Sequence, residues 1–176
     1  MSVLAGLMAG RRGLVMGVAN ERSIAWGIAQ AISAAGAEIG FTYQGDAIGR
    51  RVQPLADSVG AAFVTPCDVE NEASMTAVFE EAERVWGGLD FVLHSIAYSD
   101  RSELKGRYAD TSRENFRRTM LISCYSFTEV ARRAAPLMTN GGTLLTLSFS
   151  GAERVVPNYN VMGVAKAALE ASVRYM

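Results

Sequence analysis

Short apolar runs alternate with longer amphipathic stretches along the whole chain. The apolar runs predict strands at residues 13–17, 37–43, 62–65, 89–95 and 143–147. The stretches between and after them predict helices at residues 23–35, 48–59, 70–86, 111–137 and 158–176. Gly36, Gly60 and Gly87 directly follow three of these helices, as expected of helix stops. This order predicts a single α/β domain over residues 1–176, with a Rossmann-like, doubly wound parallel sheet in three α/β/α layers.

Composition and charge narrow the classes of function. Of the 176 residues, 49% are hydrophobic and 20% charged, which are values of a globular protein. The net charge of -1, without a long run of one sign, argues against nucleic-acid or membrane-surface partners. No apolar run approaches the roughly 18 residues of a membrane span. Cys67 and Cys124 lie far apart and His94 is the only histidine, so we expect no metal site and a reduced, cytoplasmic protein.

The segment after the first expected strand has the parts of a phosphate-binding turn. Gly17 permits a tight turn, and Ser23 at the start of the next helix can offer its hydroxyl and its backbone N–H to a phosphate. The helix N-terminus adds partial positive charge, and Gly27 leaves room for close packing. The spacing departs from the common G-x-G-x-x-G pattern. An ordinary turn in which Ser23 only caps the helix therefore remains an alternative.

The ends of the next strands also carry candidate cofactor contacts. Gln44, after the second strand, can bind a ribose hydroxyl and offers no charge to a 2′-phosphate, which favours NADH over NADPH. Arg50 and Arg51 follow closely and keep NADPH as the less favoured alternative. Asp68, after the third strand, can accept from an adenine amino group or cap the following helix. After the fourth strand, the small residue Ser95 allows a cofactor to approach the backbone.

Tyr159 and Lys166 carry the candidate chemistry. They lie seven residues apart, close to two helical turns, so both are expected on one helix face. A nearby ammonium is expected to lower the pKa of the phenol, which suits a site where negative charge develops on a substrate oxygen. The alternative is a surface pair on an amphipathic helix. The position directly after the fifth strand of a dinucleotide fold makes that alternative weaker.

Several segments, taken together, resemble one family. They are residues 17–20, 23–27, 41–44, 67–69, 94–97, 104–108, 123–126, 151–154 and 157–163. With the Tyr-x6-Lys spacing of Tyr159 and Lys166, they are similar to the bacterial enoyl-acyl-carrier-protein reductases, a divergent branch of the short-chain dehydrogenase/reductase superfamily. Ordinary members of that superfamily use Tyr-x3-Lys.

The resemblance implies an activity and a set of roles. The activity is hydride transfer from NADH to the β-carbon of a trans-2-enoyl thioester in fatty-acid synthesis. Tyr159 would bind the thioester carbonyl as it becomes an enolate, and Lys166 would hold the nicotinamide ribose. The positions that match cofactor contacts are Gly17, Ser23, Ile24, Gln44, Asp68, Val69, Ser95, Ile96, Ala97 and Lys166. Those that match the substrate pocket are Ala97, Tyr98, Phe149, Tyr159 and Met162.

The resemblance also implies partners. The substrate is an enoyl-acyl-carrier protein, and the protein is expected as a homotetramer with residues 111–137 and 158–176 in the main interface. No nucleic-acid or membrane partner is expected.

Two features depart from the family pattern. Many members have a second tyrosine where this chain has Phe149, so any role of that hydroxyl is in doubt. Members also continue into a sixth strand, a substrate-covering segment and a final strand, so the chain is interpreted as lacking the C-terminal part. These two departures leave a non-catalytic, cofactor-binding or oligomerising remnant as an alternative. A carbonyl or alcohol oxidoreductase of the same superfamily is a second alternative, because fold alone does not exclude it.

Overall fold

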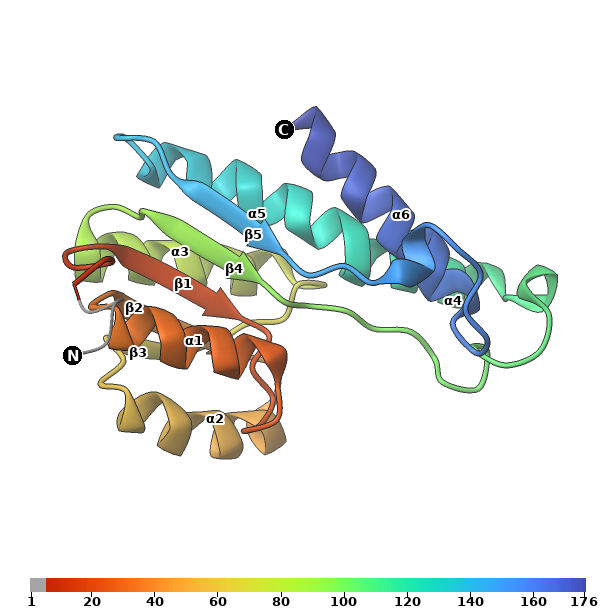
Figure 1. The fold of residues 1–176 in the computed structure, drawn as a ribbon, viewed down its shortest axis with the longest axis horizontal. Coiled ribbons are helices and arrows are strands. Elements are labelled where there is room, and N and C mark those ends of the chain that lie inside the picture. Colours follow the sequence, from red (N-terminus) through yellow and green to blue (C-terminus); the bar gives the residue numbers. More distant parts are fainter. Residues whose placement is uncertain (1–5) are drawn as a thin grey trace. The chain divides into compact units, whose positions relative to one another are not determined.

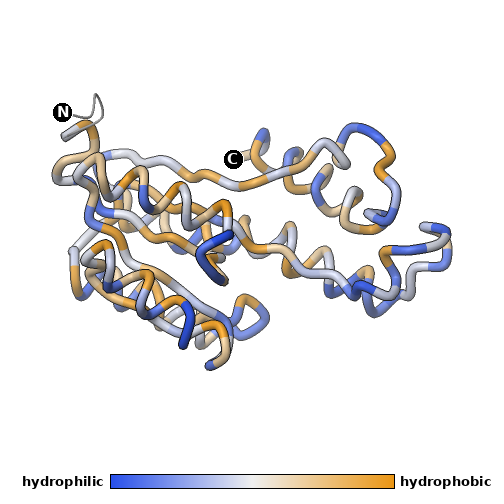
Figure 2. Tube along the Cα trace, turned by 60° about the horizontal axis from the view of Figure 1, so that its bottom comes forward, coloured by the Kyte–Doolittle hydropathy of each residue, from blue (hydrophilic) through white to orange (hydrophobic). Residues whose placement is uncertain are grey.

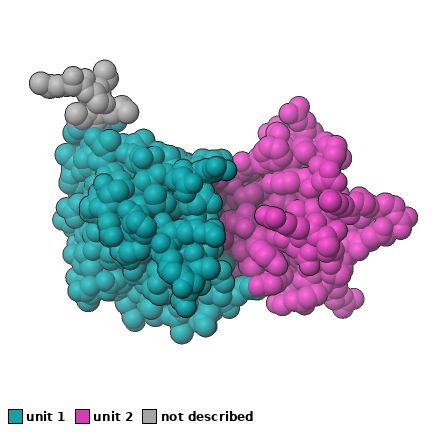
Figure 3. All heavy atoms as spheres, turned by 90° about the horizontal axis from the view of Figure 1, so that it is seen from below, with its two compact units in different colours: residues 1–95, 131–145 teal, residues 96–130, 146–176 magenta. Residues whose placement is uncertain are grey.

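The computed structural model describes residues 6–176, which divide into two compact units (Figure 3). Unit 1 takes residues 1–95, as far as they are described, and 131–145. Unit 2 takes residues 96–130 and 146–176. The expectation of a single dinucleotide-binding domain over residues 1–176 stays a prediction.

Unit 1 is built on a five-stranded sheet in the order β3-β2-β1-β4-β5. The strands are β1 (Arg12–Met16), β2 (Glu38–Tyr43), β3 (Phe63–Pro66), β4 (Phe91–His94) and β5 (Thr143–Thr146). β1 pairs in parallel with β2 on one side and β4 on the other, and β2 pairs in parallel with β3. Val15 lies at the centre of this register, opposite Phe41 and Leu93. All three side chains are buried, as expected for a sheet covered on both faces.

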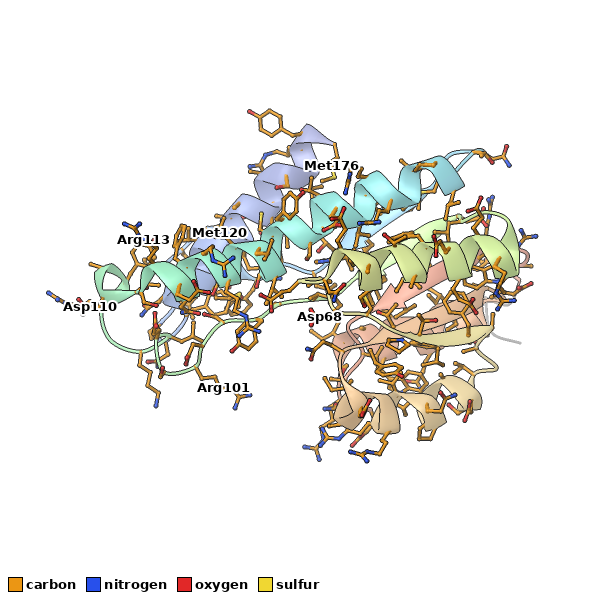
Figure 4. The ribbon with its side chains drawn as sticks, turned by 180° about the vertical axis from the view of Figure 1, so that it is seen from behind. Asp68, Arg101, Asp110, Arg113, Met120 and Met176 are labelled. Atoms are coloured by element: carbon orange, nitrogen blue, oxygen red, sulfur yellow. The ribbon has the colours of Figure 1, made fainter. Side chains whose placement is uncertain are left out.

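Helices cover both faces of this sheet. α1 (Ile24–Ala34) and α2 (Asp46–Ser58) return the chain on one face, and α3 (Glu72–Trp86) on the other (Figures 1 and 4). This follows from right-handed crossovers, because the chain moves outward from β1 to β3 and then returns to β4. Hydrophobic residues recur along the tube within these elements (Figure 2). The predicted doubly wound parallel α/β fold is therefore confirmed, with element ends shifted by a residue or two.

Unit 2 is largely helical. It contains α4 (Arg113–Met120), a π-helical turn (Leu121–Tyr125), the start of α5 (Ser126–Ala134) and α6 (Asn160–Tyr175). Single 3-10 turns lie at Tyr108–Asp110 and Ser150–Ala152. The buried face of α6 includes Val161, Ala165 and Leu169, which recur at helical spacing.

The prediction of one continuous helix over residues 111–137 is wrong. Here α4 passes through the π-helical turn into α5, and a 3-10 turn over Ala135–Leu137 follows. Pro136 sits in that last turn and has no N–H to continue an α-helix. Hydrophobic periodicity did not reveal the π-helical turn.

The final helix begins later than predicted. α6 starts at Asn160 rather than at residue 158, because the backbone of Asn158 is left-handed, with a φ of 60°. Within residues 6–176, no helix combines the length and the apolar character that crossing a membrane requires.

Candidate functional site

In unit 1, the carboxyl ends of β1 and β4 meet at Gly17 and Ser95. The Ser95 N–H donates to the Met16 carbonyl oxygen at 2.9 Å. Gly17 has a φ of +102°, and a Cβ there would lie 1.9 Å from the Ser95 carbonyl oxygen, so only glycine suits this position. From β1 the sheet continues to β2 on one side and to β4 on the other. In open α/β sheets, such a reversal of strand order is where a dinucleotide binds.

The loop between β1 and α1 is shaped by Ser23. Its hydroxyl oxygen accepts from the N–H groups of Ala19 and Asn20, at 3.0 and 3.2 Å. The Ser23 N–H donates to the Asn20 carbonyl oxygen at 3.1 Å. Contrary to expectation, this N–H is thus engaged within the loop. The hydroxyl hydrogen is not used by those bonds, so the side chain retains a donor. It makes no cap hydrogen bond to α1.

Asp68 holds the loop after β3, but it does not cap α3. Its N–H donates to Ser74 Oγ, and its Oδ1 accepts from the Glu70 N–H, both at 2.9 Å. The cap of α3 is Asn71, whose side chain accepts from the Ser74 N–H at 3.0 Å. The cap alternative for Asp68 is therefore wrong. Figure 4 labels Asp68, where the chain has left β3.

The donor set at these strand ends fits a dinucleotide. Gln44 is exposed directly after β2, and Val69 and Ser95 are partly exposed. Ile24 is 70% exposed at the start of α1, whose first turn carries no acidic side chain. A helix N-terminus without a carboxylate suits a phosphate, and the neutral amide of Gln44 suits a ribose.

In unit 2, Tyr159 precedes α6 as its N-cap residue rather than lying inside it. Its neighbours Asn158 and Asn160 both have positive φ values, of 60° and 34°. The Tyr159 ring meets that of Phe149 edge-on, with 5.0 Å between the ring centres. A Cβ on Gly151 would lie 2.5 Å from a carbon of the Tyr159 ring. The phenol is therefore seated between an aromatic ring and bare backbone.

The Lys166 side chain contacts the segment that also contacts Tyr159, namely residues 147–151. It is 7% exposed, and its Nζ donates to the Leu147 carbonyl oxygen at 2.7 Å. The side chains of Tyr159 and Lys166 thus both contact residues 147–151, the segment that follows β5. Glu170, one turn further along α6, is hydrogen-bonded to the hydroxyl of Ser148 in that segment.

The expected lowering of the tyrosine pKa is wrong in this structure. Burial raises the pKa of Tyr159, and Lys166 is not among the causes of its shift. Burial also lowers the pKa of Lys166, while Cys124 and Glu170 act in the opposite direction. The Lys166 ammonium itself is directed to the Leu147 carbonyl oxygen. Tyr159 is therefore a neutral hydrogen-bond donor at about pH 7.

A pocket of about 380 Å³ lies in unit 2 beside Tyr159. Residues 151–156, together with Tyr108 and Val164, form much of its lining. Tyr108 and residues 151–154 lie in segments that carry the family resemblance, but no role in a pocket was expected of them. Val155, Val156 and Val164 were not expected at the site, because they lie in a stretch without regular periodicity or on an outer helix face.

The remaining predicted substrate residues lie outside that lining. Ala97 and Tyr98 are exposed after β4, Phe149 is exposed beside Tyr159, and Met162 is buried in α6. Ile96, expected at the cofactor, is partly exposed. His94, the single histidine, is buried. Residues 6–176 contain no cluster of metal-ligating side chains, and within them both cysteines are buried and form no disulfide.

Comparisons with known proteins agree on one family. A family model described as enoyl-(acyl carrier protein) reductase matches residues 17–176. The curated enoyl-[acyl-carrier-protein] reductase [NADH] 2 of Rhizobium meliloti (strain 1021) is 64% identical over 171 residues. That match covers 97% of this chain and 64% of the relative, so the chain spans about two thirds of its relative's length.

Solved structures give the same result. An enoyl-(acyl-carrier-protein) reductase from Anaplasma phagocytophilum, crystallised in complex with NAD, is 57% identical with a TM-score of 0.95. The match covers 97% of this chain and 65% of that one. The Bacillus cereus enoyl-acyl carrier protein reductase, solved with NADP+ and an indole naphthyridinone, is 51% identical with a TM-score of 0.94. Here the coverage is 97% and 67%.

Proposed function

The chain belongs to the enoyl-(acyl carrier protein) reductase family, and we propose that it acts as an NADH-dependent enoyl-acyl-carrier-protein reductase of fatty-acid synthesis. One observation carries this proposal. Tyr159 is a half-buried, neutral phenol that lines a pocket. Its side chain contacts residues 147–151, and so does the side chain of the buried Lys166. Such a phenol can donate a hydrogen bond to an oxygen on which negative charge develops.

The proposed roles follow from the two clusters of residues. When bound, NADH would supply a hydride to the β-carbon of the enoyl thioester. The Tyr159 hydroxyl donates to the thioester carbonyl oxygen and stabilises the charge that arrives there. It can do so at about pH 7 because a phenol of ordinary pKa is protonated there, and burial shifts the pKa of Tyr159 further upward. Lys166 contributes an ammonium whose remaining hydrogens can hold ribose hydroxyls.

The cofactor preference is part of the proposal. Gly17, Ser23, Gln44 and Asp68 are the residues that would hold the dinucleotide. Gln44 offers an amide and no positive charge, which supports NADH. Since a relative has been crystallised with NADP+, NADPH is the necessary comparison. We expect a lower KM for NADH than for NADPH.

The turnover assay follows NADH absorbance in the complete protein with crotonyl thioester as substrate. Turnover supports the proposal. Activity with a carbonyl substrate only would indicate an alcohol or ketone oxidoreductase, and NADH binding without turnover would indicate a non-catalytic protein.

Tyr159→Phe tests the role of the phenol. We expect kcat to fall by about 10²-fold or more, as when one oxyanion donor is lost, while stability at about pH 7 changes little. The variant keeps the ring on Phe149 and removes only the hydroxyl. Wild-type kcat in the variant would remove Tyr159 from this role.

Assembly into a homotetramer is also proposed. It is supported by large apolar side chains exposed on the helices that the resemblance assigns to the interface, namely Phe116, Tyr125, Val164, Val173 and Tyr175. Native mass spectrometry of the complete protein tests this, and a monomer would contradict it. The acyl-carrier protein as substrate carrier rests on the family. A cytoplasmic location stays a prediction of the sequence.

A further inference from the structure

The Ser123 hydroxyl binds both main-chain groups of Tyr98. It accepts from the Tyr98 N–H at 2.9 Å and donates to the Tyr98 carbonyl oxygen at 3.0 Å. A hydroxyl has a single hydrogen to donate, and here that hydrogen is used on Tyr98. The pattern is that of a hydrogen-bonded pair in a sheet, in which one residue exchanges both bonds with its neighbour. Ser123 therefore replaces a neighbouring strand where the chain has left β4.

Two further buried polar residues extend this arrangement along α4. Thr119 Oγ1 donates to Ser99 Oγ at 2.9 Å, and Asn115 Oδ1 accepts from the Asp100 N–H at 3.0 Å. Asn115, Thr119 and Ser123 are spaced by four residues, so they form one stripe. The consecutive loop residues 98, 99 and 100 are thus bound by residues 123, 119 and 115. All three stripe residues are buried, which makes their hydrogen bonds difficult to replace with water.

The last position of the stripe lies in the π-helical turn, Leu121–Tyr125. Figure 4 labels Met120, where α4 ends and this turn begins, and Arg101 in the loop that the stripe holds. π-helical turns are rare and are often found at functional sites. This one carries the only member of the stripe that binds two main-chain groups of a single loop residue. A cation–π contact also binds the Tyr98 side chain, since the Arg118 guanidinium lies 4.6 Å from the centre of the Tyr98 ring.

We propose that Ser123 is a positioning residue that fixes the main chain of Tyr98 and thereby the acyl-chain preference of the enzyme. The effect on substrate preference rests on the function proposed above, whereas the effect on Tyr98 does not. The Ser123 hydroxyl is hydrogen-bonded to Tyr98 and not to Tyr159 or Lys166, so its loss leaves the reacting groups in place. That loss would release the main chain of Tyr98, an exposed residue that the resemblance assigns to the substrate pocket.

The test compares Ser123→Ala with Ser172→Ala. Ser172 is the control. Its hydroxyl donates within α6 to the Ala168 carbonyl oxygen at 2.9 Å and lies 3.6 Å from Cys124 Sγ, so its loss perturbs the π-helical turn without removing a hydrogen bond to Tyr98. Amide hydrogen exchange, followed by NMR, reports the Tyr98 N–H. With its buried partner removed, we expect exchange at Tyr98 to accelerate on the order of tenfold or more, and to stay unchanged in Ser172→Ala. Ser123→Thr, which keeps a hydroxyl, should restore slow exchange.

Kinetics separate positioning from a general loss of structure. In Ser123→Ala we expect KM for a dodecenoyl thioester to rise several-fold, with kcat for crotonyl thioester unchanged. Unchanged Tyr98 exchange, or equal changes in KM for both substrates, would overturn the proposal. If exchange accelerates throughout the chain, Ser123→Cys decides, because it keeps the volume and weakens the bond. Faster exchange confined to Tyr98 in Ser123→Cys supports the proposal, and faster exchange throughout the chain overturns it. A wild-type protein that reduces no enoyl thioester would refute the proposed function, and the exchange data would still judge the hold on Tyr98.

Discussion

Replacing Gly17 with alanine tests the close approach of β1 and β4. A Cβ at this position would lie 1.9 Å from the Ser95 carbonyl oxygen and 2.5 Å from its carbonyl carbon. Both atoms belong to the backbone of a paired strand end, so neither can move without disturbing the sheet. A residue other than glycine at a left-handed φ costs about 1–2 kcal/mol, and forcing an extra group into packed structure adds about 1–3 kcal/mol. We therefore expect the free energy of unfolding to fall by about 2–5 kcal/mol.

Gly60→Ala supplies the control. Gly60 also has a positive φ, of +63°, but a Cβ there would meet nothing within 4 Å. It therefore carries only the backbone cost of about 1–2 kcal/mol. Urea unfolding followed by circular dichroism gives both values, and in thermal melts Gly17→Ala should lose roughly 2–12 °C more than the control. Equal destabilisation of the two variants would refute the reasoning, because it would mean that Gly17 does not lie against Ser95.

Two further predictions concern single side chains. Asn71→Ala should lower the free energy of unfolding by about 1 kcal/mol in urea titrations, because it removes the acceptor for the Ser74 N–H. Asn71→Ser should recover most of that free energy. A free energy of unfolding equal to that of the wild type in Asn71→Ala would contradict the cap. Burial lowers the pKa of Lys166, so between its folded pKa and the ordinary lysine value of about 10.4 the unfolded chain binds more protons and stability rises with pH. Lys166→Met should remove that rise, and an unchanged pH slope of the free energy of unfolding would contradict the shift.

The fold was accessible from the sequence because its signals are local. Apolar runs of strand length, helices of regular period and glycines at helix ends each report their own segment. Their order then leaves few topologies, since crossovers are right-handed and helices must cover both faces of a parallel sheet. The position of Gly17 at the end of β1 could be predicted for the same reason.

The Tyr159 environment was only partly accessible. The seven-residue spacing predicted that the phenol and the lysine share one face, and both do contact residues 147–151. Their charge relationship was predicted wrongly. A sequence gives the distance along a helix, but it does not give the direction of a long side chain or the depth at which it is buried. In the folded chain the Lys166 side chain is buried, and its ammonium is directed to the Leu147 carbonyl oxygen, nineteen residues earlier.

The sequence by itself determined the order of strands and helices, the strand ends at which ligands bind, and the residue types that can perform the chemistry. Tertiary structure alone decided which backbone groups those residues meet. The Ser23 hydroxyl accepts a hydrogen bond from its own loop, and the Lys166 ammonium donates to the Leu147 carbonyl oxygen. The Ser123 hydroxyl is hydrogen-bonded to the main chain of Tyr98, 25 residues earlier. The physical reason is that periodicity records only whether a side chain is buried, whereas a buried polar group must also find a partner of the right geometry.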